Sequence, residues 1–509
     1  MKTKLQKYFR PISLSTASIL LVLASFLSYV AGFLRDLILS YYFGAGSLTD
    51  VYSTAFLIPD ILFNFTVAAA LAGAFMPIFR GVYLKDKNEA ADLAGAFLWS
   101  SQIFMLVVAG ICFISMPWLV PVLFGNASLT EQSLIIDLSR IMLLSPIVFS
   151  VSNTLGSVLM SFKHYLSYAL SAALYNFGII LGVLMFHTEY GIYSAAFGVV
   201  IGLVFHLGVR LIDMYSVDFR LNMKLWSPHI WDIVKLSLPR SFGLISMQLS
   251  LLCFTIVGYS LVDGSIAAFN LARNVQSFAV SLFGIAVATA VFPFLVDHNE
   301  KSESEELLTK VNFSLLQICL YTIPATAGLA LLANPIINFL FERGAFDSAA
   351  TMLTASILFY FAFSVPFESA VHLLSRVFYV FKHTWTLVVI NLVFLAVNLV
   401  TGFLIAKEYG AWVFGLSFAV GNFIQVVLMW FALKRFVMLR FSLILKDLLK
   451  VVLSTGGMGL AVYGFNYYQF NLLGTILVGV LIYLLLITKF GILKYAGLER
   501  FKFISKLIK

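Results

Sequence analysis

Charged residues are scarce in this chain of 509 residues, where Asp, Glu, Lys and Arg together make up 11%. Soluble domains carry about 25% charged residues, so this supply is too small to build a water-facing surface. Hydrophobic residues account for 61% of the chain, and its mean hydropathy is +0.97. We therefore expect an all-α polytopic membrane protein.

Cysteine is also rare, with three residues in the whole chain. All three lie in apolar runs and have neither metal-ligand spacing nor a disulfide pattern. The sequence also lacks a P-loop, an HExxH motif and a GxSxG motif. These absences predict a secondary transporter and no enzyme, with no metal and no cofactor. The formal net charge of +9 fits basic cytoplasmic loops, and no nucleic-acid partner is expected.

Long apolar runs are what the chain has in abundance. A helix needs about 20 apolar residues to cross the bilayer, and this rule gives about fourteen spans. The first run is too long for the apolar region of a signal peptide, so it reads as a membrane span. The expected spans are 12–40, 51–79, 91–119, 134–161, 166–187, 190–214, 229–259, 264–295, 308–332, 350–379, 384–406, 411–434, 446–467 and 471–493.

The loop charges orient these spans. Lys and Arg gather in the loops on the side of the N-terminus, whereas the opposite side supplies essentially Arg343 and Lys407. Cytoplasmic loops carry the excess of basic residues in membrane proteins. Both termini are therefore expected in the cytoplasm.

Two parts of the chain repeat each other. Residues 162–164 (FKH) match 381–383, and residues 189–191 (EYG) match 408–410, both at an offset of 219. His164 and His383 thus occupy equivalent turns, where an interfacial structural role is expected. Parallel repeats with a substrate site between them are a known transporter plan. The expected division is 1–220 (six-helix N-terminal lobe), 221–440 (six-helix C-terminal lobe) and 441–509 (two further spans and a tail).

Ionisable residues within the spans are the functional candidates, since a charge at the bilayer centre costs about 2.5–3.5 kcal/mol. Arg35 and Asp36 are adjacent and point to different helix faces, so they need not pair with each other. Arg35 and Arg273, from different lobes, are expected to face a cavity that suits an anion such as a pyrophosphate. Structural pairing, or snorkelling in the case of Arg240, is the alternative. The full set is Arg35, Asp36, Asp50, Arg240, Arg273 and Glu368.

Four sequence motifs carry a family resemblance. They are VAGFLRD (30–36), FGAGSLTD (43–50), LFERGAFD (340–347) and SRVFYVFKHT (375–384). On these motifs, and on its span count and length, the chain resembles the MurJ/MviN family of lipid II flippases. That family lies within the multidrug, oligosaccharidyl-lipid and polysaccharide exporter superfamily.

The resemblance implies a two-lobed fold with a cationic central cavity and alternating access. It implies transport of lipid II, the undecaprenyl-pyrophosphate-linked peptidoglycan precursor, from the inner to the outer leaflet of the bacterial cytoplasmic (inner) membrane. The last two spans would form a groove for the lipid tail. The implied partners are lipid II, membrane lipids and cell-wall synthesis enzymes.

By the resemblance, Arg35, Asp36, Asp50 and Arg273 fall on the family's functional charged positions, and the other candidates complete the expected site. The substrate-binding residues are Arg35, Arg273, Ser28 and Arg240, and the gating or coupling residues are Asp36, Asp50, Glu368 and Gln276. The chain departs from the family pattern where it has lost charges, at Tyr29, Phe63, Asn64, Ala68 and Gln276. The expected cavity therefore holds fewer charges than the family pattern.

Three other functions remain open from the sequence. The first is a flippase for another polyprenyl-linked glycan, of the O-antigen or capsule type. The second is a cation-coupled drug exporter, which the two surplus spans disfavour. The third is a scaffold without transport that recruits cell-wall enzymes. The energy source also remains open, with the membrane potential or a monovalent cation as the candidates.

Overall fold

The computed structural model describes residues 14–65, 71–300, 304–434 and 442–496. Within these ranges the chain is almost entirely helical and forms no β-strand. Contacts divide it into two compact units. Unit 1 comprises residues 1–267 and 343–346, and unit 2 comprises residues 268–342 and 347–509. The expectation of an all-α membrane fold is confirmed.

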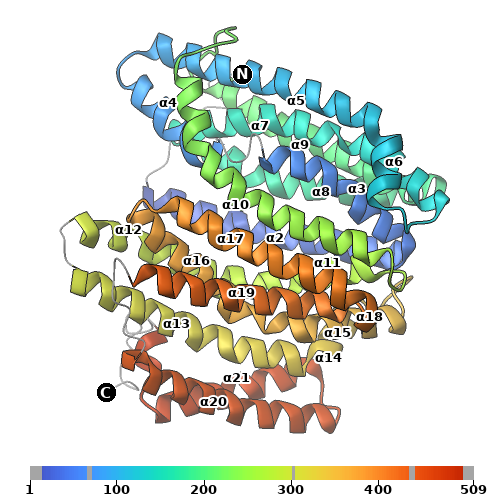
Figure 1. Ribbon diagram of the computed structural model, residues 1–509, viewed down its shortest axis with the longest axis vertical. Helices are drawn as coiled ribbons and strands as arrows, with labels where there is room; N and C mark the ends of the chain where they lie inside the picture. The colour runs from blue at the N-terminus through green and yellow to red at the C-terminus, as the bar shows by residue number, and fades with distance from the viewer. Residues whose placement is uncertain (1–13, 66–70, 301–303, 435–441, 497–509) are drawn as a thin grey trace. The chain divides into compact units, whose positions relative to one another are not determined.

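Unit 1 holds the helices of the first half of the chain (Figure 1). They are α2 (Leu14–Phe43), α3 (Ser47–Phe63), the π-helix η2 (Leu71–Phe75), α4 (Met76–Tyr83), α5 (Lys87–Leu123), α6 (Leu129–Met142), α7 (Leu144–Ser161), α8 (Leu166–Tyr190), α9 (Tyr193–Ser216) and α10 (His229–Gly258). Polar side chains start several of them. Asp86 accepts bonds from two backbone N–H groups at the start of α5, and Ser128 and Glu131 form a capping box on α6.

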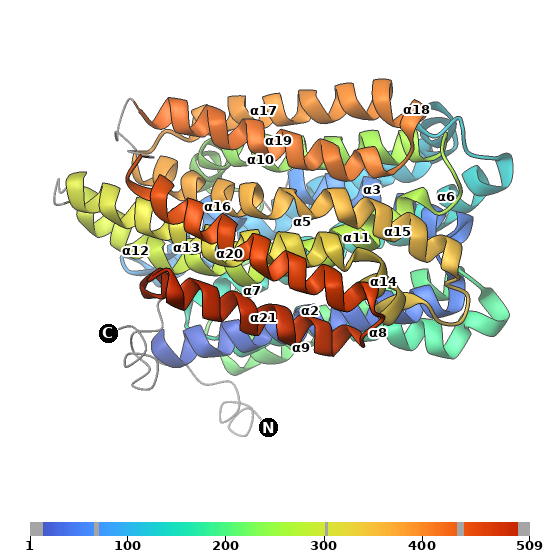
Figure 2. The ribbon, with the colours of Figure 1, turned by 90° about the horizontal axis from the view of Figure 1, so that it is seen from below.

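Helix α11 (Ser265–Ala279) begins in unit 1 and continues into unit 2. The other helices of unit 2 are η3 (Val280–Ile285), α12 (Ala286–Glu300), α13 (Ser304–Leu331), α14 (Ala333–Phe341), α15 (Ser348–Ala362), α16 (Ser364–Val380), α17 (Thr384–Val400), η4 (Thr401–Ala406), α18 (Lys407–Tyr409), α19 (Trp412–Leu433), α20 (Ser442–Tyr467), α21 (Leu472–Lys489) and η5 (Leu493–Ala496). The last long pair, α20 and α21, packs against α13 (Figure 2).

Helices long and apolar enough to cross a membrane number 10 in the described ranges, or up to 11 if α15 and α16, bent by 47°, form one span. The chain is thus a multi-pass membrane protein. The count of about fourteen is not confirmed. The expected spans that fall short are 12–40, 51–79 and 229–259. Each of them includes positions outside the described residues or side chains, among 12–22, at 66–70 and among 239–244, so only part of each span enters the count.

The internal repeat is visible in the helix boundaries. At the offset of 219, α9 starts at the counterpart of the first residue of α19, and α7 ends at the counterpart of the last residue of α16. Lys163 and Lys382 both have positive φ, at 65° and 59°. The two copies therefore share their local backbone. The lobe boundaries at 220 and 440 stay a prediction, because the two units are defined by contacts and not by the repeat.

Small residues bring helices together in unit 1. Helices α8 and α9 lie side by side (Figure 1), and a Cβ on Gly178 would stand 2.3 Å from the Cα of Gly202. No side chain fits at such a distance, so the two backbones touch. This close packing gives α8 a fixed position in unit 1. Helix α8 carries Asn176, a residue of the candidate site.

Candidate functional site

Arg35 is the centre of a polar cluster in unit 1. Its Nε and Nη2 donate to Oδ1 of Asp36 at 3.0 and 2.8 Å, and its Nη1 donates to Oδ1 of Asn176 at 3.0 Å. The Arg35 side chain keeps 26% of its surface exposed, whereas that of Asp36 keeps 10%. The guanidinium is thus held by two partners on a side chain that stays partly exposed.

The structure corrects the expectation that Arg35 and Asp36 need not pair. Their Cβ atoms do leave the helix on different faces, but the long arginine side chain reaches back to the neighbouring carboxylate. The pairing partly neutralises a charge pair within an apolar helix, where an isolated charge is costly. Sequence reasoning missed Asn176 altogether. Its position as a polar residue in the middle of the apolar run 166–187 is a signal that could have identified it.

Ser28 lies two helical turns before Arg35 in α2 and is partly exposed. Its neighbour Tyr29, where the family pattern has an arginine, is 44% exposed. Ser28 and Arg35 are seven residues apart and therefore lie on similar faces of the helix. A role for Ser28 in binding substrate stays a prediction.

A second polar cluster lies in unit 2. Nε2 of Gln276, on α11, donates to Oγ of Ser364 at 2.8 Å and to Oε2 of Glu368 at 2.9 Å, both on α16. Gln276 is 1% exposed. Arg273, one turn earlier on α11, is partly exposed and interacts electrostatically with the Glu368 carboxylate. Three of the expected residues therefore come together, with Ser364 as a member that the sequence did not indicate.

Arg240 belongs to α10, but its side chain lies outside the described residues. Ala68, one of the departures from the family pattern, also lies outside them. The roles expected at or around these positions stay predictions.

Asp50 has a partner that the sequence did not suggest. Its two carboxylate oxygens accept bonds from the backbone N–H groups of Gly264 at 2.8 Å and Ala267 at 2.7 Å. These groups stand at the start of α11, where unpaired N–H groups and the helix dipole favour an anion. Asp50 is 4% exposed. It therefore fixes the beginning of the helix that carries Arg273 and Gln276.

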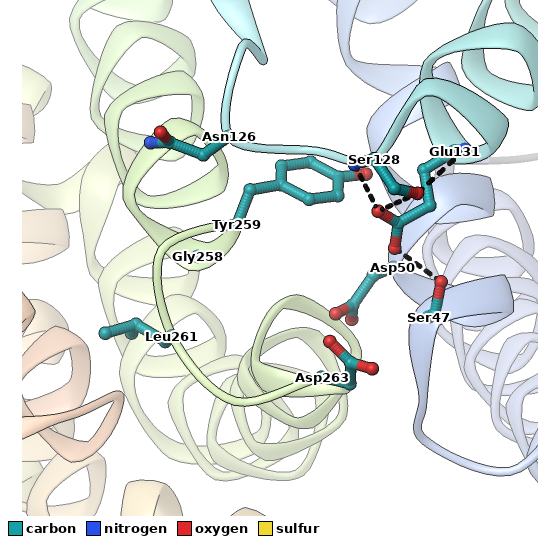
Figure 3. A pocket seen from close by; sticks show the side chains of 9 residues that line it. All are labelled: Ser47, Asp50, Asn126, Ser128, Glu131, Gly258, Tyr259, Leu261 and Asp263. Carbon is teal, nitrogen blue, oxygen red and sulfur yellow. Dashed lines mark hydrogen bonds between the residues drawn. The ribbon is translucent and has the colours of Figure 1, made fainter.

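A pocket of about 400 Å³ opens beside Asp50 in unit 1. Figure 3 shows the carboxylates of Asp50, Glu131 and Asp263 around this space, with the Tyr259 ring on one side. The described residues contain no group of three His, Cys, Asp or Glu side chains that could hold a metal ion. Because the lining is acidic, the pocket does not suit a phosphate group.

The expected site thus appears as two clusters, one around Arg35 and one around Gln276, with Asp50 capping a helix. The structure describes each unit by itself. That Arg35 and Arg273 line one cavity stays a prediction.

Comparisons with known proteins agree with the fold. Residues 39–484 match the family model described as lipid II flippase MurJ. A probable lipid II flippase MurJ of Bdellovibrio bacteriovorus is 27% identical over 457 residues, which cover 86% of each chain. One from Aquifex aeolicus is 26% identical and covers 89% of each chain.

Solved structures show the same architecture. A lipid II flippase MurJ in an inward closed conformation matches with a TM-score of 0.79 and 24% identity, covering 93% of this chain and 98% of that one. An inward-facing multidrug resistance transporter of the MATE family matches with a TM-score of 0.67 and 16% identity, covering 80% of this chain and 96% of that one. Since the family model spans most of the sequence, the chain belongs to the lipid II flippase MurJ family.

Proposed function

We propose that this protein is a transporter, not an enzyme, that moves lipid II from the inner to the outer leaflet by alternating access. The observation that carries the proposal is the family match over residues 39–484, together with the Arg35–Asp36 pair at positions that the family resemblance marked. Relatives across many bacteria bear the name lipid II flippase.

The chemistry of Arg35 supports this substrate. A guanidinium has five N–H donors, and three of those of Arg35 are used by Asp36 and Asn176. Two donors remain, and the side chain keeps 26% of its surface exposed. Guanidinium groups bind phosphate oxygens in a fixed geometry and stay charged at any physiological pH. We propose that Arg35 and Arg273 contact the pyrophosphate of lipid II.

A carboxylate interacts with each arginine. Asp36 and Asn176 orient Arg35, and Glu368 with Gln276 provides a partly neutralising surface near Arg273. A substrate phosphate that competes with these carboxylates can be bound and released again. The proposal includes coupling to the membrane potential or to a monovalent cation, and a location in the bacterial cytoplasmic membrane with both termini inside.

Cells depleted of their own flippase and expressing this chain test the proposal, with accessibility of lipid II at the outer face as the readout. We expect the wild-type chain to restore accessibility and growth, and Arg35→Ala and Arg273→Ala to abolish both while still inserting in the membrane. Arg140→Ala is the matched control, because Arg140 lies on α6 and donates to the backbone carbonyl of Phe113.

Two results would overturn parts of this proposal. Full activity of both arginine variants would remove the role assigned to these side chains. Failure of the wild-type chain to restore lipid II accessibility, with rescue of a strain that lacks a glycan exporter, would instead identify a flippase for another polyprenyl-linked glycan.

A further inference from the structure

Helix α16 carries a polar stripe that extends beyond the Glu368 cluster. Glu368, His372 and Arg376 are spaced four residues apart and therefore lie along one face of the helix. Glu368 belongs to the site described above. His372 and Arg376 have no role in it so far.

Arg376 is held by neutral groups. Its Nη2 donates to Oγ1 of Thr289 on α12 at 2.7 Å, and its Nη1 donates to the backbone carbonyl of His372 at 2.9 Å. No carboxylate pairs with it among the residues that the structure describes. Two of its five N–H donors are used, so three remain for a ligand on this partly exposed side chain.

His372 adds a second group without a partner. Its backbone carbonyl accepts from Arg376, but its imidazole makes no hydrogen bond within the described ranges. The ring is close enough to the guanidinium for the two to interact electrostatically. A cation and a hydrogen-bonding ring thus lie side by side with unused donors.

Arg376 contacts an exposed part of α12. Thr289, its partner on α12, is exposed, and so are the short side chains Ala286 and Ala290 on the same helix. Short side chains leave space beside the guanidinium. A basic residue within a span faces a cavity or the head-group region, because hydrocarbon cannot solvate it. The expected topology places the end of α16, before Lys382, toward the cytoplasm.

We propose that Arg376 and His372 form a phosphate-binding site that receives the pyrophosphate of the lipid substrate on the cytoplasmic side. The naming of this lipid rests on the proposed function. Guanidinium suits the two phosphates through paired N–H donors, and an imidazole adds a third contact.

Binding to the purified full-length chain in phosphatidylcholine nanodiscs tests the site. The probes are undecaprenyl pyrophosphate and, separately, phosphatidylglycerol. We expect Arg376→Gln to raise the Kd for undecaprenyl pyrophosphate about tenfold, as the loss of a charged hydrogen-bonding group does. His372→Gln should have a smaller effect, and Arg376→Lys should fall between the wild type and Arg376→Gln.

The matched control is Arg140→Gln, which removes an arginine from α6 and should leave the Kd unchanged. An unchanged Kd for undecaprenyl pyrophosphate in folded Arg376→Gln overturns the proposal, and so does an equal increase in the control. Loss of phosphatidylglycerol binding alone would make Arg376 an anchor for membrane lipids and overturn its role toward the substrate. If Arg376→Gln does not fold, the Arg376→Lys and His372→Gln variants decide by the same criterion.

Failure of this inference is distinguishable from failure of the proposed function. If the wild type flips lipid II and the Arg376 variants bind the pyrophosphate normally, only this inference is wrong. If the wild type does not flip lipid II but binds undecaprenyl pyrophosphate through Arg376, the site stands and the assigned transport fails.

Discussion

The turn between α7 and α8 in unit 1 and the turn between α16 and α17 in unit 2 have the same backbone but different chemistry. In each, a lysine has positive φ, and the next N–H bonds a carbonyl five residues earlier, from His164 to Leu159 and from His383 to Phe378, both at 3.0 Å. His164 is nevertheless buried against Asp213, whereas His383 is exposed.

The residues around these turns explain the difference. In unit 1, Nδ1 of His164 contacts Oδ1 of Asp213 at 2.8 Å, and Ser167 donates to the other carboxylate oxygen. At the offset of 219, the counterpart of Asp213 is Ala432, and the counterpart of the buried Arg210 is Met429. His164 therefore has a structural role as a buried member of a polar network, and an interfacial role for the exposed His383 stays a prediction.

The comparison teaches which features of a repeat persist. Turn geometry depends on a few backbone bonds and survives when the side chains change. Buried polar groups need partners, so they are gained or lost together. In unit 1, Arg210 donates hydrogen bonds to Asn153 and Ser171. In unit 2, the counterparts of Arg210 and Ser171 are Met429 and Ile390, which belong to an apolar cluster.

The largest expected effect comes from removing the centre of the unit 1 network. Asp213→Ala removes the carboxylate that His164 and Ser167 contact in a buried place. We expect a loss of about 3–5 kcal/mol in the free energy of unfolding, as found when one member of a buried pair is removed. Denaturation in detergent micelles measures it. A loss below about 1 kcal/mol would mean that the network contributes little to unit 1.

The two histidines offer a matched test of the same contrast. His164→Ala removes one hydrogen bond to a buried carboxylate and should cost about 1–3 kcal/mol. His383→Ala, at the equivalent exposed position, should change stability by less than about 0.5 kcal/mol. Both variants are compared by the same denaturation curves. Equal effects would contradict the claim that the two turns differ in burial.

The smallest expected effect tests what the two turns share. Lys163→Gly and Lys382→Gly place glycine where φ is positive, which L side chains adopt at a cost. We expect each substitution to stabilise the protein, by about 0.5–1 kcal/mol. The midpoints of thermal unfolding check it. A higher midpoint of thermal unfolding for only one of the two variants would show that the two backbones are not equivalent.

Much of the fold could be predicted from the sequence. Every expected span overlaps a helix, because apolar runs of this length are local signals that tertiary packing rarely changes. Ten or eleven of the expected spans are counted among the described residues, and the other three, 12–40, 51–79 and 229–259, are only partly described.

The sequence could predict which residues belong to the candidate site, but it could not predict which side chains they contact. Arg35, Gln276 and Glu368 all belong to clusters, yet their partners Asn176 and Ser364 were absent from the expected set. A single asparagine or serine in an apolar run is common and carries little signal alone. Arg376 was part of a quoted motif, and only its neighbours in the structure single it out as a cation that pairs with no carboxylate of the described residues.

The sequence by itself determined the class of protein, the positions of its helices, the internal repeat and the residues that carry charge into the membrane. Hydropathy and motif spacing are properties of the linear chain, so they require no knowledge of packing. The tertiary structure decided which charges have partners. Asn176 reaches Arg35 across 141 positions, and Gly264 reaches Asp50 across 214. Such pairs depend on which helices pack together, and that choice is made by many weak contacts at once.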